Sequence, residues 1–134
     1  MYRDVVLAAG KRTPFGDFGG SLKDTPLSVL GAHSVKATLA AADIDGARVD
    51  HLTFGNVMPV DYDGNFISRK VALDAGLPIE SGALTVNRAC GSGSEAIASA
   101  ARLVLCGASR FGIAAGGENF SRVPYIAPNV RWGA

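Results

Sequence analysis

The strongest constraint on the fold is an alternation of short apolar runs with segments that carry helical periodicity. The apolar runs have the length and the β-branched residues of buried strands, whereas the periodic segments repeat apolar residues every three or four positions. This order predicts an α/β fold, βαβαβαβ, with a mostly parallel sheet and right-handed crossovers. The expected strands are 4–9, 52–57, 83–87 and 111–115, and the expected helices are 27–42, 66–75 and 91–105.

Composition narrows the class of protein. The 134 residues are enough for one hydrophobic core, and 48% hydrophobic with 19% charged residues is a globular mixture. A formal net charge of +1 gives no electrostatic reason to expect nucleic acid or an anionic membrane as a partner. No apolar stretch reaches membrane-spanning length and no secretory signal precedes the first strand, so we expect a cytoplasmic protein without membrane contact.

Two cysteines, Cys90 and Cys106, are too few for a disulfide framework or a zinc site. A helix over 91–105 would separate them by roughly 24 Å, which is far beyond bridging distance. We therefore expect two free thiols and no bound metal.

Cys90 lies between a predicted strand and the glycines that open a predicted helix. Backbone N–H groups in the first turn of a helix lack intrahelical partners, and the helix dipole favours negative charge there. Both effects stabilise a thiolate, and the same N–H groups can receive the oxyanion of an acyl-transfer intermediate. Cys90 is therefore a candidate nucleophile; the alternative is a small buried residue that only packs.

The same stretch fits a second chemistry. Gly91-Ser92-Gly93-Ser94-Glu95-Ala96 matches the G-x-G-x-x-A pattern of dinucleotide-binding loops between a strand and a helix, which would indicate an NAD-dependent oxidoreductase. Such a motif normally follows the first strand of its unit, and it would leave Cys90 without a role. The residues alone leave both interpretations open.

Several segments in order resemble the thiolase (acetyl-CoA acetyltransferase) family. Val86-Asn87-Arg88-Ala89-Cys90-Gly91-Ser92-Gly93 is similar to the active-site signature of that family. The resemblance extends over nearly the whole chain through these further segments: Lys11-Arg12-Thr13-Pro14-Phe15-Gly16, Phe54-Gly55-Asn56-Val57, Gly116-Gly117-Glu118-Asn119 and, most like biosynthetic β-ketothiolases, Arg131-Trp132-Gly133-Ala134.

The resemblance implies that Cys90 carries an acyl group between coenzyme A thioesters, acyl-CoA and acetyl-CoA, with no tightly bound cofactor. It implies that residues 1–118 form part of the N-terminal domain of a layered thiolase-like fold and that 119–134 begin the loop domain that holds coenzyme A. The remaining catalytic residues of the family lie in a C-terminal half, so a second chain or segment is an expected partner and the isolated chain is expected to be inactive; alternatively, the chain is a non-catalytic fragment with a thiolase fold. It also implies a homo-oligomer, a dimer or tetramer, paired along 84–87.

The remaining candidate residues are expected to have structural roles. Neither histidine lies in a catalytic motif of the family. Ser94 and Glu95 stand where members of the family usually have an apolar residue followed by Gln or Lys. The expected roles are surface or core packing for His33, His51 and Cys106, loop bracing for Glu118, anchoring of the cysteine loop for Asn87, and packing or narrowing of an acyl pocket for Phe120.

Overall fold

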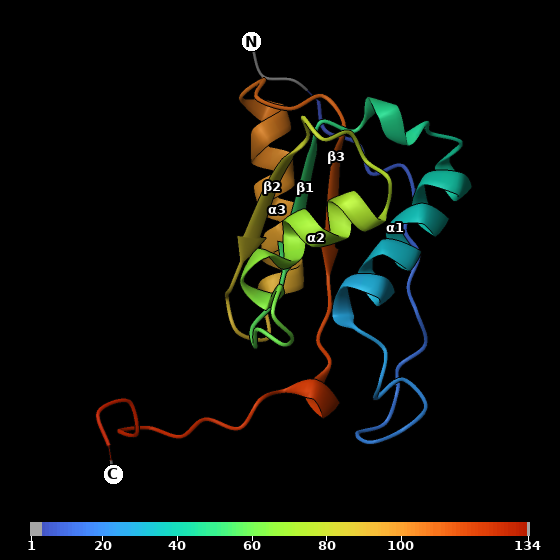
Figure 1. The fold of residues 1–134 in the computed structure, drawn as a ribbon. Helices are drawn as coiled ribbons and strands as arrows, with labels where there is room; N and C mark the ends of the chain where they lie inside the picture. Colours follow the sequence, from blue (N-terminus) through green and yellow to red (C-terminus); the bar gives the residue numbers. More distant parts are fainter. Residues whose placement is uncertain (1–3, 134) are drawn as a thin grey trace.

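The computed structural model describes residues 4–133. Its fold is a parallel sheet between two layers of helices (Figure 1). The sheet has β1 (His51–Gly55) at its centre, flanked by β2 (Gly82–Val86) and β3 (Gly112–Gly116). Both pairings are parallel and in step: Gly55 lies opposite Val86 and Gly116. The carboxyl ends of all three strands therefore meet at one edge of the sheet.

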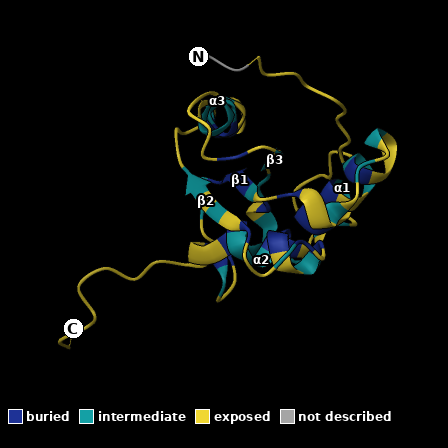
Figure 2. Cartoon of the chain, turned by 90° about the horizontal axis from the view of Figure 1, so that it is seen from above, coloured by how far each residue is buried: buried dark blue, intermediate teal, exposed yellow. Residues whose placement is uncertain are grey.

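Helices cover both faces of this sheet. Helices α1 (Leu27–Ala42) and α2 (Ile67–Asp74) lie on one side, and α3 (Ser92–Leu105) lies on the other and contacts all three strands (Figure 2). Short 3₁₀ turns follow α1, precede α2 and follow β3: η1 (Gly46–Arg48), η2 (Gly64–Phe66) and η3 (Phe120–Arg122). No helix among residues 4–133 is both long and apolar enough to cross a membrane.

The main core lies between the sheet and the α1–α2 layer. Leu52 and Phe54 alternate with Thr53 along β1 and point into this core, where they meet side chains of both helices. Gly31 allows the close approach of α1, since a Cβ there would lie 2.7 Å from Val71 Cγ2 and 3.0 Å from Phe54 Cε2. The largest fully buried side chains are Phe54, Leu52, Ile67, Val35, Val60 and Val71.

Most predicted elements are confirmed within two residues. The helix expected over 27–42 has those bounds, and Pro26 occupies its N-cap. The predicted strands 52–57, 83–87 and 111–115 correspond to β1, β2 and β3, and helices 66–75 and 91–105 correspond to α2 and α3. A parallel α/β architecture is therefore confirmed, and residues 4–133 contain three strands in place of the four expected.

The strand predicted over 4–9 is wrong. These residues have no strand hydrogen bonds, and Val6 and Leu7 remain 83% and 82% exposed. A strand needs a hydrogen-bonded neighbour, and a gap of about 310 Å³ lies between residues 4–11 and the stretch 110–115, which includes most of β3. The apolar run has the composition of a strand, but this gap keeps it away from the edge of β3 that is unpaired in the described chain.

Candidate active site

The loops that leave the three strands are joined at the carboxyl edge of the sheet. Glu118, just beyond β3, accepts hydrogen bonds from Asn56 Nδ2 at 2.6 Å and from the N–H groups of Val57 at 3.1 Å and Met58 at 2.9 Å. Asn56 Nδ2 also donates to Gly117 O at 3.1 Å. Glu118 thus braces the loop after β1, as predicted, and its carboxylate is occupied by that role.

The loop after β2 carries Cys90 and is fixed at its start by Asn87. The side-chain oxygen of Asn87 accepts the N–H of Ala89 at 3.1 Å, and its amide nitrogen donates to Val57 O at 3.2 Å. Asn87 therefore ties the cysteine loop both to itself and to the loop after β1. This is the anchoring role expected of Asn87.

Ser92, the first residue of α3, fixes the other side of the loop. Its side chain accepts the N–H of Arg88 at 2.8 Å and donates to Ala89 O at 2.6 Å, and the residue is 4% exposed. The N-cap residue Gly91 makes no side-chain cap. The hydroxyl of Ser92 therefore binds back to the loop that precedes it and does not cap the helix.

Ala89 adopts a left-handed conformation immediately before the cysteine, with φ of 48°. This conformation costs an L-residue with a Cβ about 1–2 kcal/mol. Such backbone strain persists where neighbouring bonds over-determine the geometry, and it concentrates at functional sites. The bonds from Asn87 and Ser92 supply that constraint on both sides of Ala89.

Glycines let the first turn of α3 sit directly on the sheet. A Cβ on Gly55 would lie 2.4 Å from Ser92 O, and one on Gly116 would lie 3.3 Å from Gly93 Cα. No side chain fits between the ends of β1 and β3 and the helix start. The position of the helix N-terminus, and with it Cys90, is therefore set by backbone contact.

Cys90 itself is exposed, and its thiol is free. Both neighbouring N–H groups are bonded, Ala89 N to Asn87 and Gly91 N to Arg88 O at 3.0 Å. Within residues 4–133 no acceptor takes the N–H of Cys90. The loop thus leaves Cys90 exposed with a free thiol and, among the described residues, with an N–H that has no acceptor. A thiol and a backbone donor are the two groups that an acyl-transfer nucleophile needs.

The other sequence candidates lie elsewhere. Cys106 is also free but follows the last residue of α3, so the helix separates the two thiols as predicted. His51 begins β1 at the opposite edge of the sheet, and burial lowers its pKa while Asp50 acts to raise it. In the described part of the chain, no group of three or more His, Cys, Asp or Glu side chains is arranged to hold a metal.

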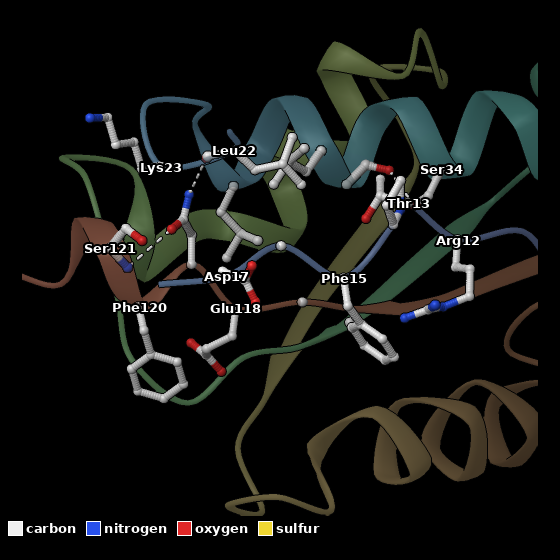
Figure 3. Close-up of a pocket in the computed structure, with 18 of the residues that line it drawn as sticks. Arg12, Thr13, Phe15, Asp17, Leu22, Lys23, Ser34, Glu118, Phe120 and Ser121 are labelled. Atoms are coloured by element: carbon white, nitrogen blue, oxygen red, sulfur yellow. Dashed lines mark hydrogen bonds between the residues drawn. The ribbon is translucent and has the colours of Figure 1, made fainter. Parts of the chain in front are cut away.

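A cavity of about 430 Å³ lies between the loop before α1 and the segment after β3. Figure 3 shows Arg12 and Phe15 lining it from the first segment and Glu118 and Phe120 from the second. Phe120 is exposed, so it is not packed in the core. Cys90 does not line this cavity, so the cavity and the cysteine loop are separate features of the molecule.

Sequence reasoning missed two contributors to the site. In the sequence Ser92 is a small residue between two glycines. Its spacing of four residues from Arg88 is the one signal for the hydrogen bond that its hydroxyl accepts from Arg88 N. Glu95 pairs with Arg88 and Arg102, each at 2.6 Å, and the first of these pairs links α3 to the cysteine loop. Hydrogen bonds from Arg102, Arg88 and Ser99 lower the pKa of Glu95 to about 2.

The comparisons with known proteins decide between the two chemistries. The family described as "Thiolase, N-terminal domain" matches residues 5–134. The chain belongs to the thiolase family. The dinucleotide-binding interpretation of residues 91–96 is not favoured, and the predicted resemblance is confirmed.

Relatives and solved structures agree with this assignment. The chain is 47% identical over 134 residues to "Beta-ketothiolase BktB" of Cupriavidus necator and 39% identical over 133 residues to "Acetyl-CoA acetyltransferase" of Syntrophomonas wolfei. Human mitochondrial 3-ketoacyl-CoA thiolase in complex with CoA matches with a TM-score of 0.92 and 38% identity over 95% of this chain. The chain covers 34%, 33% and 32% of these thiolases, respectively, about a third of their length.

Proposed function

We propose that this chain carries the nucleophile of a thiolase and that, together with a C-terminal half, it forms or cleaves β-ketoacyl-CoA by acyl transfer through Cys90. The observation that carries the proposal is the exposed Cys90 thiol beside its own unbonded N–H, on a loop fixed from both sides. The assembly of this chain with the rest of the relatives' length, which includes that C-terminal half, is called the complete enzyme below.

The proposed reaction has two acyl transfers. The Cys90 sulfur attacks the thioester carbon of an acyl-CoA, the bond between that carbon and the coenzyme A sulfur breaks, and coenzyme A leaves with a proton. A base on the C-terminal half then removes an α-proton from acetyl-CoA. The resulting carbon attacks the acyl group on Cys90, whose thiolate leaves, and β-ketoacyl-CoA is released; the reverse sequence with free coenzyme A is thiolysis.

The residues of this chain have two tasks in that scheme. Cys90, which immediately precedes the N-cap of α3, supplies the attacking sulfur, and its N–H donates to the oxyanion that forms when the thioester carbonyl is attacked. The thioester itself activates the α-proton, so the scheme needs no tightly bound cofactor. The substrates are coenzyme A thioesters.

A C-terminal half is needed for structural reasons as well. The outer edge of β3 is unpaired in the described chain, and Trp132 is 93% exposed in the segment that follows η3. Unpaired edges and exposed aromatic side chains are features that proteins normally cover. Residues 119–134 begin the loop domain in this proposal, and the remaining strands and loops come from the second segment.

Two further assignments complete the proposal. Two copies pair along β2, which is the other edge strand and leaves Leu84 41% exposed, to give a dimer or a tetramer. The compartment is the cytoplasm, since two exposed free thiols suit a reducing environment.

The test compares the two cysteines in the complete enzyme. Cys90→Ser should reduce thiolysis by at least about 1,000-fold, the scale seen when a nucleophile is removed, while the matched control Cys106→Ser should stay within about twofold of the parent. Iodoacetamide near neutral pH should label Cys90 faster than Cys106, and acetyl-CoA should protect Cys90 alone. Full activity of Cys90→Ser would overturn the proposal, as would equal labelling of both thiols without protection.

A further inference from the structure

We propose that Ser92 is a positioning residue for the nucleophile: its buried hydroxyl holds the Arg88–Ala89 turn so that the thiol and N–H of Cys90 face the substrate. The inference rests on the proposed function, because it assigns Ser92 a role through Cys90. Ser92 does not touch the substrate in this scheme.

The geometry around Cys90 shows how one hydroxyl can set its position. Ser92 Oγ accepts from Arg88 N at 2.8 Å and donates to Ala89 O at 2.6 Å, while Ser92 N donates to the same carbonyl at 3.0 Å. The two residues before the cysteine are thereby fastened to the second residue after it. Cys90 lies inside this closed loop, and among residues 4–133 no bond holds its own N–H.

The conformation of Ala89 depends on these hydrogen bonds of Ser92 with Arg88 and Ala89. The left-handed φ of 48° is disfavoured for alanine and relaxes when the bonds that impose it are removed. Rotation at Ala89 turns the Cys90 N–H and the direction of its side chain together. Loss of the Ser92 hydroxyl should therefore misplace both groups while the helix and the sheet remain.

A helix-capping role is not an adequate explanation for Ser92. The residue lies inside α3 as its first position, and the two partners of its hydroxyl are loop residues that precede the helix. A cap would bind N–H groups of the first helical turn. Removal of the hydroxyl is therefore expected to act on loop geometry more than on helix stability.

Ser81 offers a matched control. It is also buried, and its hydroxyl also donates to a backbone carbonyl, Val49 O at 2.7 Å, but it lies at the amino edge of the sheet. Ser81→Ala and Ser92→Ala remove the same group from similar surroundings at opposite ends of β2. A general loss of stability should appear in both variants, whereas loss of nucleophile placement should appear only in Ser92→Ala.

The experiment measures kcat, KM and the rate of Cys90 alkylation as a function of pH in the complete enzyme, with urea midpoints for folding. Ser92→Ala should lower kcat by about 100-fold, the scale of a displacement of about 1 Å, with KM changed less than about threefold and Cys90 alkylation slowed. Ser81→Ala should keep kcat and alkylation within about twofold of the parent. A kcat for Ser92→Ala within twofold of the parent would overturn the inference, as would equal losses in both variants.

Ser92→Thr covers the case in which Ser92→Ala does not fold. Threonine keeps the hydroxyl, so kcat should stay within about tenfold of the parent; a folded Ser92→Thr that is slowed by about 100-fold, with Cys90 alkylation unchanged, would overturn the inference. Failure of the proposed function gives a different result, because Cys90→Ser would then remain active whatever the Ser92 variants do.

Discussion

The amino edge of the sheet, where the three strands begin, and the carboxyl edge, where they end, are held by similar polar hydrogen bonds but differ in what they expose. At the amino edge, Asp50 accepts the N–H of Arg110 at 2.8 Å and the hydroxyl of Ser109, and Ser81 donates to Val49 O. At the carboxyl edge, Glu118 and Ser92 bind the loops in the same manner, side chain to backbone. Bracing of loops by polar side chains is therefore common to both edges and does not itself indicate function.

The difference between the edges lies at one residue. The carboxyl edge exposes Cys90, whose N–H is unbonded within the described chain and which follows a left-handed alanine. Its loop leads into α3, which sits in backbone contact with the strands. The amino edge holds His51 partly buried, and burial lowers its pKa. The comparison indicates how a candidate reactive residue can be found in a structure. A side chain and a backbone N–H that have no hydrogen-bond partner on a constrained backbone are more informative than the number of polar residues nearby.

The largest expected difference between the edges comes from their glycines. Gly55→Ala places a Cβ 2.4 Å from Ser92 O, which is backbone and cannot yield, whereas Gly112→Ala at the amino edge meets only ordinary contacts of 3.6 Å or more. We expect Gly55→Ala to destabilise the complete enzyme by about 2–3 kcal/mol and to displace Cys90, and Gly112→Ala to cost less than about 1 kcal/mol. Urea unfolding of both variants checks this, and equal midpoints would contradict the seating of α3 on Gly55.

A smaller effect is expected in the middle of the sheet, between the two edges. Thr53 is 0% exposed, and within the described chain its hydroxyl has no hydrogen-bond partner. Thr53→Val removes an unpaired buried polar group at nearly constant shape, so we expect a stability gain of about 1 kcal/mol with kcat unchanged. Thr53→Ser, which keeps the hydroxyl and removes the methyl group, is the control and should destabilise. A loss of stability in Thr53→Val would indicate a partner for this hydroxyl.

The amino edge should be more sensitive to mild acid than the carboxyl edge. Burial lowers the pKa of His51 below its ordinary value, and its Nε2 has no partner among residues 4–133. The unfolded chain then binds the proton more readily, so stability is complete above about pH 6.5 and decreases as the pH falls below that value. His51→Gln should reduce this dependence in urea midpoints measured between pH 8 and 5. An unchanged slope in His51→Gln would assign the effect to another group.

The smallest effect is expected on the exposed side of α3, beside the carboxyl edge. Arg102, Arg88 and Ser99 lower the pKa of Glu95 to about 2, so its contribution is present above the ordinary glutamate pKa and is lost as the pH falls towards 2. The ion pairs are solvent-exposed, so Glu95→Gln should change the urea midpoint at pH 7 only slightly. Asp63→Asn, a charge change on the loop between β1 and α2, is the control for net charge. A large loss of kcat in Glu95→Gln would mean that the Arg88 pair also holds the cysteine loop.

The spacing of apolar residues and the glycines at the ends of elements were sufficient to predict the helices and the three paired strands. Residues 27–42 carry their own helical spacing, and Gly91 and Gly107 mark the limits of α3 within one or two residues. The apolar run at 4–9 has a strand composition too, but pairing depends on a neighbour, and composition contains no information about one. Local pattern therefore predicted each element, and the strand count failed where a distant segment was required.

The site divides in the same way. Cys90 could be proposed as the nucleophile from the sequence because its neighbours in the chain, a strand and a glycine-rich helix start, create its environment. The bonds of Glu118 to residues 56–58 span some sixty positions and follow no period, so only the folded chain reveals them. Ser92 is near in sequence, yet the left-handed turn at Ala89 that brings its hydroxyl to Arg88 N has no signal in residue type, since alanine rarely adopts it.

The most direct test of the account is the covalent intermediate on Cys90. The complete enzyme is mixed with acetyl-CoA in the absence of free coenzyme A, quenched in acid, digested and analysed by mass spectrometry. We predict one acetyl group on the peptide that contains Cys90, none on the peptide that contains Cys106, and none on either in Cys90→Ser. An active enzyme that shows no acetyl group on Cys90, or that shows it on a different side chain, would contradict the assignment of this cysteine as the acyl carrier.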